Sequence, residues 1–174
     1  MSVSFLQVRP LTDADAAVLG AWAEDELFCR HAGWTSSSPA KVCDFWIRQI
    51  KDPPTGLLRL AAESVDRELL GYMDLHGTDP ESRELGFLVG PSRRWGHGLG
   101  RRIAEAGLTY GFTELSLERI WAEAVAANVA SVQILRSLGM RETGRGEAET
   151  FLETNSYYLQ FEILRDAWEL GADR

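Results

Sequence analysis

The stretch Gly90-Pro91-Ser92-Arg93-Arg94-Trp95-Gly96-His97-Gly98-Leu99-Gly100-Arg101-Arg102 decides the fold of this chain and points to its chemistry. Its alternating glycines let the backbone approach a ligand closely, because no side chain obstructs it. They lead into a predicted helix whose apolar stripe consists of Leu99, Ile103, Ala106 and Tyr110. The first amides of a helix lack internal partners and carry the positive end of its dipole, so the segment is predicted to cradle a phosphate or pyrophosphate.

The charge pattern around the glycines favours the same interpretation. Between Glu84 and Glu105 there are four arginines and no acidic residue, although the chain has 18 Lys and Arg, 26 Asp and Glu, and a net charge of -8. A dinucleotide-binding fingerprint is excluded because it requires glycine or alanine at Arg101, and a nucleoside-triphosphatase loop because it ends in Gly-Lys-Ser/Thr. The alternative is an ordinary turn whose arginines only keep it solvated.

On either side of this glycine-rich stretch, the sequence alternates between strand-like and helix-like segments. Arg9-Pro10-Leu11-Thr12-Asp13 is expected to break the first strand, and the tail Arg165–Arg174 is expected to be peripheral. The predicted strands are Val3–Val8, Leu57–Ser64, Glu68–Leu75, Arg83–Val89, Arg119–Val125, Met140–Thr143 and Tyr157–Ile163. The predicted helices begin at Thr12 or Asp13, after Ser36-Ser37-Ser38-Pro39, at Leu99 and at Asn128. This order predicts a mixed α/β (α+β) fold.

The composition bounds the class of protein. The 174 residues are 45% hydrophobic and contain no internal repeat or linker, so one domain over 1–174 is expected. The net negative charge disfavours nucleic-acid binding. No apolar stretch approaches the ~20 residues of a membrane span. Cys29 and Cys43 form neither a zinc-ligand pattern nor a disulfide framework, so no metal and a cytoplasmic location are expected.

Two motifs together resemble the GNAT superfamily of acyl-CoA-dependent N-acetyltransferases. Trp95-Gly96-His97-Gly98-Leu99-Gly100 fits its Arg/Gln-x-x-Gly-x-Gly/Ala signature, except that Trp95 replaces Arg or Gln. Asn128-Val129-Ala130-Ser131 followed by Leu138-Gly139-Met140 is similar to the branch of ribosomal-protein alanine and serine N-acetyltransferases. The resemblance extends from about Leu6 to Leu164. It implies a GNAT fold with a mostly antiparallel central sheet, splayed at the coenzyme site and flanked by about four helices.

The resemblance also implies a coenzyme site, with acetyl-CoA as the co-substrate. Leu88, Val89 and Gly90 match the strand end beside the pantetheine arm, and the glycine loop matches the pyrophosphate cradle. Asn128 and Ser131 match residues that face the thioester, and Asn128 is also expected to cap a helix. The implied coenzyme-binding residues are Leu88, Val89, Gly90, Arg93, Arg94, Trp95, Gly96, His97, Gly98, Leu99, Gly100, Arg101, Asn128 and Ser131.

Acetyl transfer to an amine needs a base, and a proton for the departing thiolate. Glu84 is the candidate base because it lies on the strand that enters the loop; the alternative is a solvated carboxylate or a partner of Arg83. Glu123 and His76 are weaker candidates.

Many members of the superfamily supply the thiolate's proton from a tyrosine whose position here is occupied by Leu135. Ser131 is the first substitute, and Tyr157 and Tyr158 are weaker alternatives. Asn128, which the resemblance also places at the thioester, is the remaining candidate catalytic residue.

The acceptor is expected to be a primary amine, either a small amine or a protein N-terminus. Acidic segments at Ala23–Glu26 and Glu142–Glu153 suit a cationic acceptor, although they also serve solubility. Pairing of exposed late strands would give a homodimer. Two other functions remain open: an inactive acyl-CoA-binding module, and a regulatory domain that recognises phosphorylated ligands.

Overall fold

The computed structural model describes residues 6–35 and 37–172. Its strands are β1 Gln7–Pro10, β2 Leu57–Glu63, β3 Leu69–His76, β4 Ser82–Val89, β5 Arg119–Val125, β6 Arg141–Phe151 and β7 Thr154–Leu164. Its α-helices are α1 Asp13–Trp22, α2 Glu26–Ala32, α3 Pro39–Lys51, α4 Leu99–Thr113, α5 Val129–Ser137 and α6 Arg165–Ala172, with a 3-10 turn η1 at Ser92–Arg94. None of the described helices is long and apolar enough to cross a bilayer.

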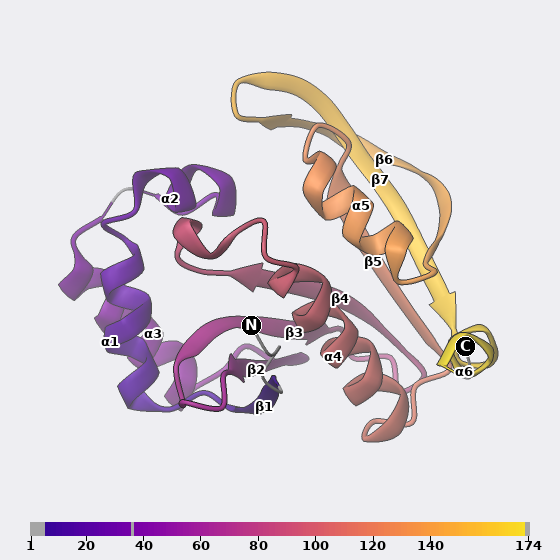
Figure 1. Cartoon of the computed structure of the whole chain (residues 1–174), viewed down its shortest axis with the longest axis horizontal. Coiled ribbons are helices and arrows are strands. Elements are labelled where there is room, and N and C mark those ends of the chain that lie inside the picture. The colour runs from indigo at the N-terminus through magenta and orange to yellow at the C-terminus, as the bar shows by residue number, and fades with distance from the viewer. Residues whose placement is uncertain (1–5, 36, 173–174) are drawn as a thin grey trace.

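The strands form one open sheet in the order β1-β2-β3-β4-β5-β7-β6, and every pair except β4 and β5 is antiparallel. The parallel pairing of β4 with β5 covers only Ser82–Glu84 against Arg119–Trp121. Beyond these residues the two strands diverge, and Figure 1 shows the sheet opening between them. The predicted mostly antiparallel GNAT sheet with a central splay is confirmed.

The strands bury side chains on both faces, because successive residues point in opposite directions. On one face Met73 and Leu85 pack with Ile103 of α4 in the larger core, which also includes Leu135 of α5. On the other face Tyr72 and Ala61 pack with residues of α1, α2 and α3 in a second core. The larger core also includes Ile120 of β5 and Phe161 of β7, so it joins the strands on both sides of the splay.

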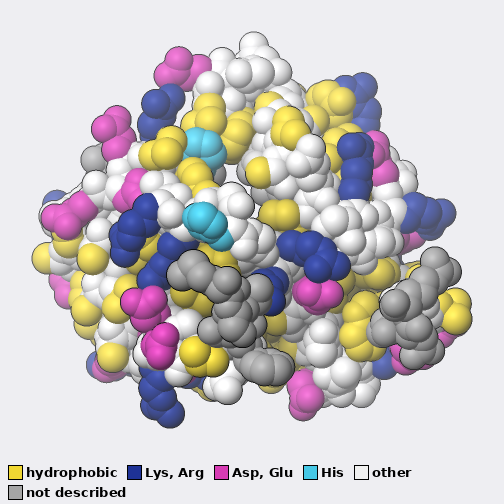
Figure 2. Space-filling view, in the orientation of Figure 1, with side chains coloured by type: hydrophobic (Ala, Val, Ile, Leu, Met, Phe, Trp, Pro, Cys, Tyr) yellow, Lys and Arg dark blue, Asp and Glu magenta, His cyan; other side chains and the backbone are white. Residues whose placement is uncertain are grey.

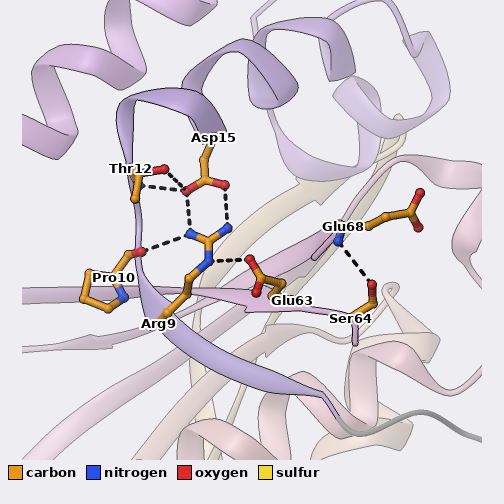
Figure 3. Close-up of polar contacts among 7 residues, drawn as sticks. All are labelled: Arg9, Pro10, Thr12, Asp15, Glu63, Ser64 and Glu68. Carbon is orange, nitrogen blue, oxygen red and sulfur yellow. Dashed lines mark hydrogen bonds and ion pairs between the residues drawn. The ribbon is translucent and has the colours of Figure 1, made fainter. Parts of the chain in front are cut away.

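An ion-pair network ties β1 to α1 and β2. Figure 3 shows Arg9 between Asp15 and Glu63, with its Nη1 and Nη2 at 2.7 and 2.9 Å from the two Asp15 oxygens. The Arg9 Nε donates to Glu63, and the Thr12 amide donates to Asp15 Oδ2 at 2.7 Å. Thr12 is the N-cap of α1, as predicted. Both carboxylates are nearly buried, so the network fixes where α1 starts on the sheet.

Most predicted elements are confirmed. Arg119–Val125 is a strand over the predicted range, Ser38 is the N-cap of α3, and Asn128 is the N-cap of α5. The apolar stripe of α4 is only partly as predicted: Ile103 is buried, but Leu99, Ala106 and Tyr110 are half-buried. The rest of the buried face is formed by Ala104, Gly107, Leu108, Gly111 and Phe112.

Three expectations about the elements were wrong. The first strand continues through Arg9 and Pro10, since both pair with β2; Val3–Phe5 of its predicted range lie outside the described residues. Six α-helices flank the sheet instead of about four. The helix α2 has only seven residues, too few for a clear periodicity, and is fixed by Asp25, whose Oδ1 accepts from the Phe28 amide. The other additional helix is α6 in the tail, which is largely exposed and whose Trp168 packs on Phe112.

The third error concerns the late strands. The predicted strand Met140–Thr143 was too short, because β6 runs from Arg141 to Phe151 through most of the acidic segment Glu142–Glu153. Its charged residues obscure the strand pattern because most of β6 is exposed, and pairing with β7 holds it in the sheet. The long β6–β7 hairpin rises beyond the rest of the sheet in Figure 1.

Candidate active site

A cleft of about 650 Å³ lies at the splay. Its walls come from the end of β4, the start of α5, the glycine loop, α2 and the tip of the β6–β7 hairpin. Figure 2 shows a hollow between the two halves of the molecule, with histidine side chains on its rim. A cleft of this size falls within the ~300–1,000 Å³ of small-molecule sites. Among the predicted coenzyme residues, those that line it are Leu88, Val89, Trp95, Gly96, Gly100, Asn128 and Ser131.

The glycine loop has the geometry of an anion cradle. Gly96 and Gly98 have φ values of +80° and +75°, which L side chains rarely adopt, and open space surrounds both α-carbons. Gly98 is the N-cap of α4, so the first amides of that helix are exposed beside the cleft. Gly100 has another role: a Cβ there would lie 2.8 Å from Ile134 Cδ1 of α5. The loop therefore offers both backbone donors and close helix packing.

The predicted residues before the loop divide between the cleft and the protein interior. Leu88 and Val89 line the cleft at the end of β4. Gly90 is buried, and a Cβ on it would lie 2.4 Å from the Trp22 ring. Gly90 is therefore required for packing of β4 against α1.

The arginines are not equivalent. Arg94 turns inward, and its Nη1 donates to the carbonyl oxygens of Leu69 at 2.6 Å and Gly90 at 3.2 Å. Its Nη2 lies 3.1 Å from Glu68. Arg101 is half exposed, and its Nη1 lies 3.5 Å from Glu105 one turn along α4. Arg93 is exposed, so Arg93 and Arg101 can turn toward a bound anion, whereas Arg94 holds the structure.

Trp95, the departure from the family signature, is partly explained by its contacts. Its Nε1 donates to the Val89 carbonyl at 2.9 Å, so the indole covers the end of β4. His31 packs on the other side, with ring centroids 4.8 Å apart. His97 and Leu99 do not line the cleft, and His97 is exposed at the turn.

Asn128 and Ser131 lie at the start of α5, where β5 ends. The Ser131 amide donates to Asn128 Oδ1 at 3.3 Å, so the capping role of Asn128 is confirmed. The Ala127 amide donates to Ser156 Oγ of β7 at 3.1 Å, which fixes the turn into the helix. Both predicted side chains therefore face the cleft from a helix N-terminus.

The structure places Leu135 in the core, 1% exposed, and turns its neighbour Ile134 toward the cleft. Neither of these α5 positions carries a hydroxyl, so neither can supply a proton. The Arg145 guanidinium lies over the Tyr157 ring, with its Cζ 3.4 Å from the ring centroid. The Tyr158 hydroxyl donates to Glu149 Oε2 at 3.2 Å.

Glu84 does not line the cleft, but lies on the sheet face opposite Leu85 and α4, where β4 and β5 still pair. Burial, reinforced by the charge of Glu123, raises the pKa of Glu84 above its usual value, while His76 acts in the opposite direction. His76 Nδ1 lies 3.9 Å from Glu84 Oε2. Glu123 accepts from Gln160 Nε2 at 2.8 Å. The Glu84 carboxylate, with its raised pKa, therefore lies near the sheet opening.

Sequence reasoning missed the cleft's outer wall. His31 of α2 packs against Trp95 and, at 5.6 Å between ring centroids, against Phe151 at the end of β6. Arg30 and Glu153 add an exposed ion pair at 3.7 Å between the same elements. Nothing local marks these residues, because α2 and the hairpin are more than a hundred residues apart in the sequence. Within the described residues, no group of three or more His, Cys, Asp or Glu could hold a metal.

Comparison with known proteins fits this geometry. The chain matches the acetyltransferase (GNAT) domain family over residues 6–141. The uncharacterized N-acetyltransferase p20 of Bacillus licheniformis is 32% identical over 145 residues, or 80% of each chain. An uncharacterized Methanocaldococcus jannaschii protein is 23% identical over 85% of this chain, which spans only 31% of that protein's length.

Solved structures show the same fold. A GNAT-family acetyltransferase from Bacillus anthracis superposes with a TM-score of 0.76 at 19% identity, covering 92% of this chain and 95% of that one. Spermidine N-acetyltransferase from Vibrio cholerae, in complex with CoA and spermine, gives 0.78 at 20% identity, covering 94% and 98%. With the splayed sheet and the glycine loop, these matches show that the chain belongs to the GNAT acetyltransferase family.

Proposed function

We propose that this protein is an acetyl-CoA-dependent N-acetyltransferase that transfers the acetyl group directly to a primary amine in a ternary complex. The observation that carries the proposal is the cleft at the splay. It combines a loop whose glycines have positive φ with the first amides of α4. A pyrophosphate on those amides would place the pantetheine arm between β4 and α5. Leu88, Val89, Asn128 and Ser131 line that path.

Glu84 is proposed as the base. An amine attacks only as the neutral species, and an α-amine with a pKa near ~8 or a lysine near ~10.4 is protonated at neutral pH. A carboxylate with a raised pKa accepts such a proton more readily than an ordinary one. Because Glu84 lies outside the cleft lining, we propose that a water molecule carries the proton to it.

The departing thiolate needs a proton, and Ser131 is the proposed donor because it lies in the cleft wall. Asn128 holds the first turn of α5 and so positions this hydroxyl. The positive end of the α5 dipole also favours a developing negative charge at this place. We also assign the protein to the branch of ribosomal-protein alanine and serine acetyltransferases, which the sequence pattern Asn-x-x-Ser supports. A cytoplasmic location is part of the same proposal.

We propose a homodimer because β6 is an edge strand of the sheet. Its outer edge offers backbone donors and acceptors that a strand of a second copy can pair with. The competing proposal is a module that retains the acyl-CoA cleft without catalysis. It is favoured by one observation, namely that the α5 positions 134 and 135 are both apolar.

Calorimetric titration with acetyl-CoA tests the proposal, with CoA, ADP and NAD as controls. Micromolar binding that requires the pantetheine arm, followed by thiol release with an amine, is the expected result. Binding without thiol release from any amine would favour the inactive module. If acetyl-CoA does not bind, both proposals fail.

A further inference from the structure

A second hollow, of about 450 Å³, lies on the sheet face that also carries Glu84. Four aromatic rings line it: Trp34, Phe45 and Trp46 from the α2–α3 region, and Tyr72 from β3. Trp46 lies 5.3 Å from Tyr72 and 6.0 Å from Trp34 between ring centroids, so the walls are rigidly packed. Phe45 is 46% exposed at the opening although it is a large apolar side chain. Such a site suits an apolar or aromatic group.

The charged side chains that line this hollow are cationic. Lys41 and Arg59 line it, and no described lining residue is acidic. Asp74 accepts two hydrogen bonds of 2.6 Å from the Nε and Nη2 of Arg59, and the guanidinium lies over the rings of Trp46 and Tyr72. The Arg59 Nη1 is not used by Asp74, so it is available for a carbonyl or carboxylate oxygen. A polyamine offers no such oxygen, and none of the described lining residues gives it an acidic partner.

The hollow is adjacent to both parts of the proposed reaction site. Trp34 packs on Phe28 at 4.9 Å between ring centroids, and Tyr72 is in register with Leu88; Phe28 and Leu88 line the coenzyme cleft. Asp74 lies opposite Gly86, two residues from Glu84 along β4. Two extended residues span about 7 Å, so a short peptide can connect the two places.

We propose that this hollow is the acceptor's specificity pocket, and that the acceptor is a peptide N-terminus with an apolar or aromatic side chain at its first or second residue. The side chain enters among the four rings and a backbone carbonyl accepts a hydrogen bond from Arg59. This inference rests on the proposed function, because it assumes that the amine is acetylated beside Glu84.

The test compares Phe-Gly-Gly, Gly-Phe-Gly, Gly-Gly-Gly and spermine as acceptors, with thiol release as the readout. We expect kcat/KM for the better phenylalanine peptide to exceed that for Gly-Gly-Gly by at least about tenfold, since burying an apolar side chain is worth ~1.5–3 kcal/mol. Phe45→Ala should lower this preference at least threefold, chiefly by lowering kcat/KM for the phenylalanine peptide. The matched control is Val65→Ala, which trims a 51% exposed side chain in the β2–β3 turn.

The outcomes separate this inference from the proposed function. Equal or better use of Gly-Gly-Gly or spermine, or a preference that Phe45→Ala leaves unchanged, would overturn the pocket assignment while acetyl transfer stands. If no amine releases thiol, calorimetry with the peptides alone still decides: binding of a phenylalanine peptide that Phe45→Ala weakens supports the pocket, and no binding rejects it. Thermal denaturation of both variants confirms that they are folded.

Discussion

The two sides of the splay are built in different ways. The coenzyme side, from β4 through the glycine loop to α4 and from β5 to α5, depends on local backbone features: glycines with positive φ, an exposed helix start and an Asn cap. The acceptor side joins α2, α3, the outer strands and the hairpin through ring contacts and ion pairs between distant segments. The proposed donor site is therefore formed by segments that are local in the sequence, whereas the proposed acceptor site depends on tertiary packing.

The largest expected effect breaks the coenzyme side alone. Gly98→Glu places a negative charge beside the predicted pyrophosphate, and like charges ~4 Å apart cost about 4 kcal/mol near a surface, or about a thousandfold in affinity. Calorimetry with acetyl-CoA measures this loss.

Gly139→Glu is the matched control for this loss. Gly139 has a φ of +79° and open space around it, as Gly98 does, but follows α5 outside the cleft. Equal loss of affinity in both variants would mean that backbone strain, and not the cradle, is responsible.

Glu84→Gln tests the chemistry between the two sides. We expect turnover to fall about 100-fold with acetyl-CoA affinity unchanged, because a positioned base contributes roughly 10²–10⁴-fold. The carboxylate form is the active one and burial raises its pKa, so the wild-type rate should increase as the pH rises through that raised pKa. The variant should lose this dependence.

Glu123→Gln is the comparison for Glu84. The charge of Glu123 is the second contribution, after burial, that raises the pKa of Glu84. Its removal should shift the acid limb of the rate profile to lower pH and preserve most of the turnover at neutral pH. A loss as large as that of Glu84→Gln would identify Glu123 as a direct participant.

Asp15→Asn tests the attachment to the sheet of α1, which packs with α3 of the acceptor side. Burial acts to raise the pKa of Asp15, but hydrogen bonds from Arg9 and Thr12 outweigh it and lower the pKa. Breaking a buried pair costs ~3–5 kcal/mol, and we expect about 2 kcal/mol because Glu63 still holds Arg9. Urea unfolding at neutral pH measures the loss.

The pH dependence of Asp15 has a definite sign. Because its folded-state pKa is depressed, the carboxylate stabilises the fold above the unfolded pKa of ~3.9, and this stabilisation is lost as the pH falls through the folded value. The variant should therefore lose part of the wild type's acid dependence. Unchanged acid unfolding would show that the network contributes little.

The smallest expected effects compare two arginines of the same loop. Arg101→Gln should weaken acetyl-CoA binding about threefold to tenfold, with little change in stability, since its ion pair with Glu105 is exposed. Arg94→Gln should lower the free energy of unfolding by ~1–2 kcal/mol and leave affinity unchanged, because its donors bind Leu69 and Glu68. If Arg94→Gln weakened acetyl-CoA binding and Arg101→Gln lowered stability, the two roles assigned to these arginines would be wrong.

The sequence alone was enough to locate the segments that form the proposed coenzyme site. Alternating glycines, the stripe of α4 and the cap at Asn128 are local signals, because φ preference, helix periodicity and capping act over a few residues. They placed the loop, α4, β5 and α5 almost to the residue.

Only the tertiary structure decided which of these residues face the cleft. Arg94 and Arg101 look equivalent in the sequence. In the structure, however, Arg94 donates to the Leu69 carbonyl of β3. The aromatic hollow unites Trp34, Phe45 and Trp46 with Tyr72, and the outer wall unites His31 with Phe151. Such contacts form only when the folded sheet brings distant segments together, so no short-range pattern encodes them.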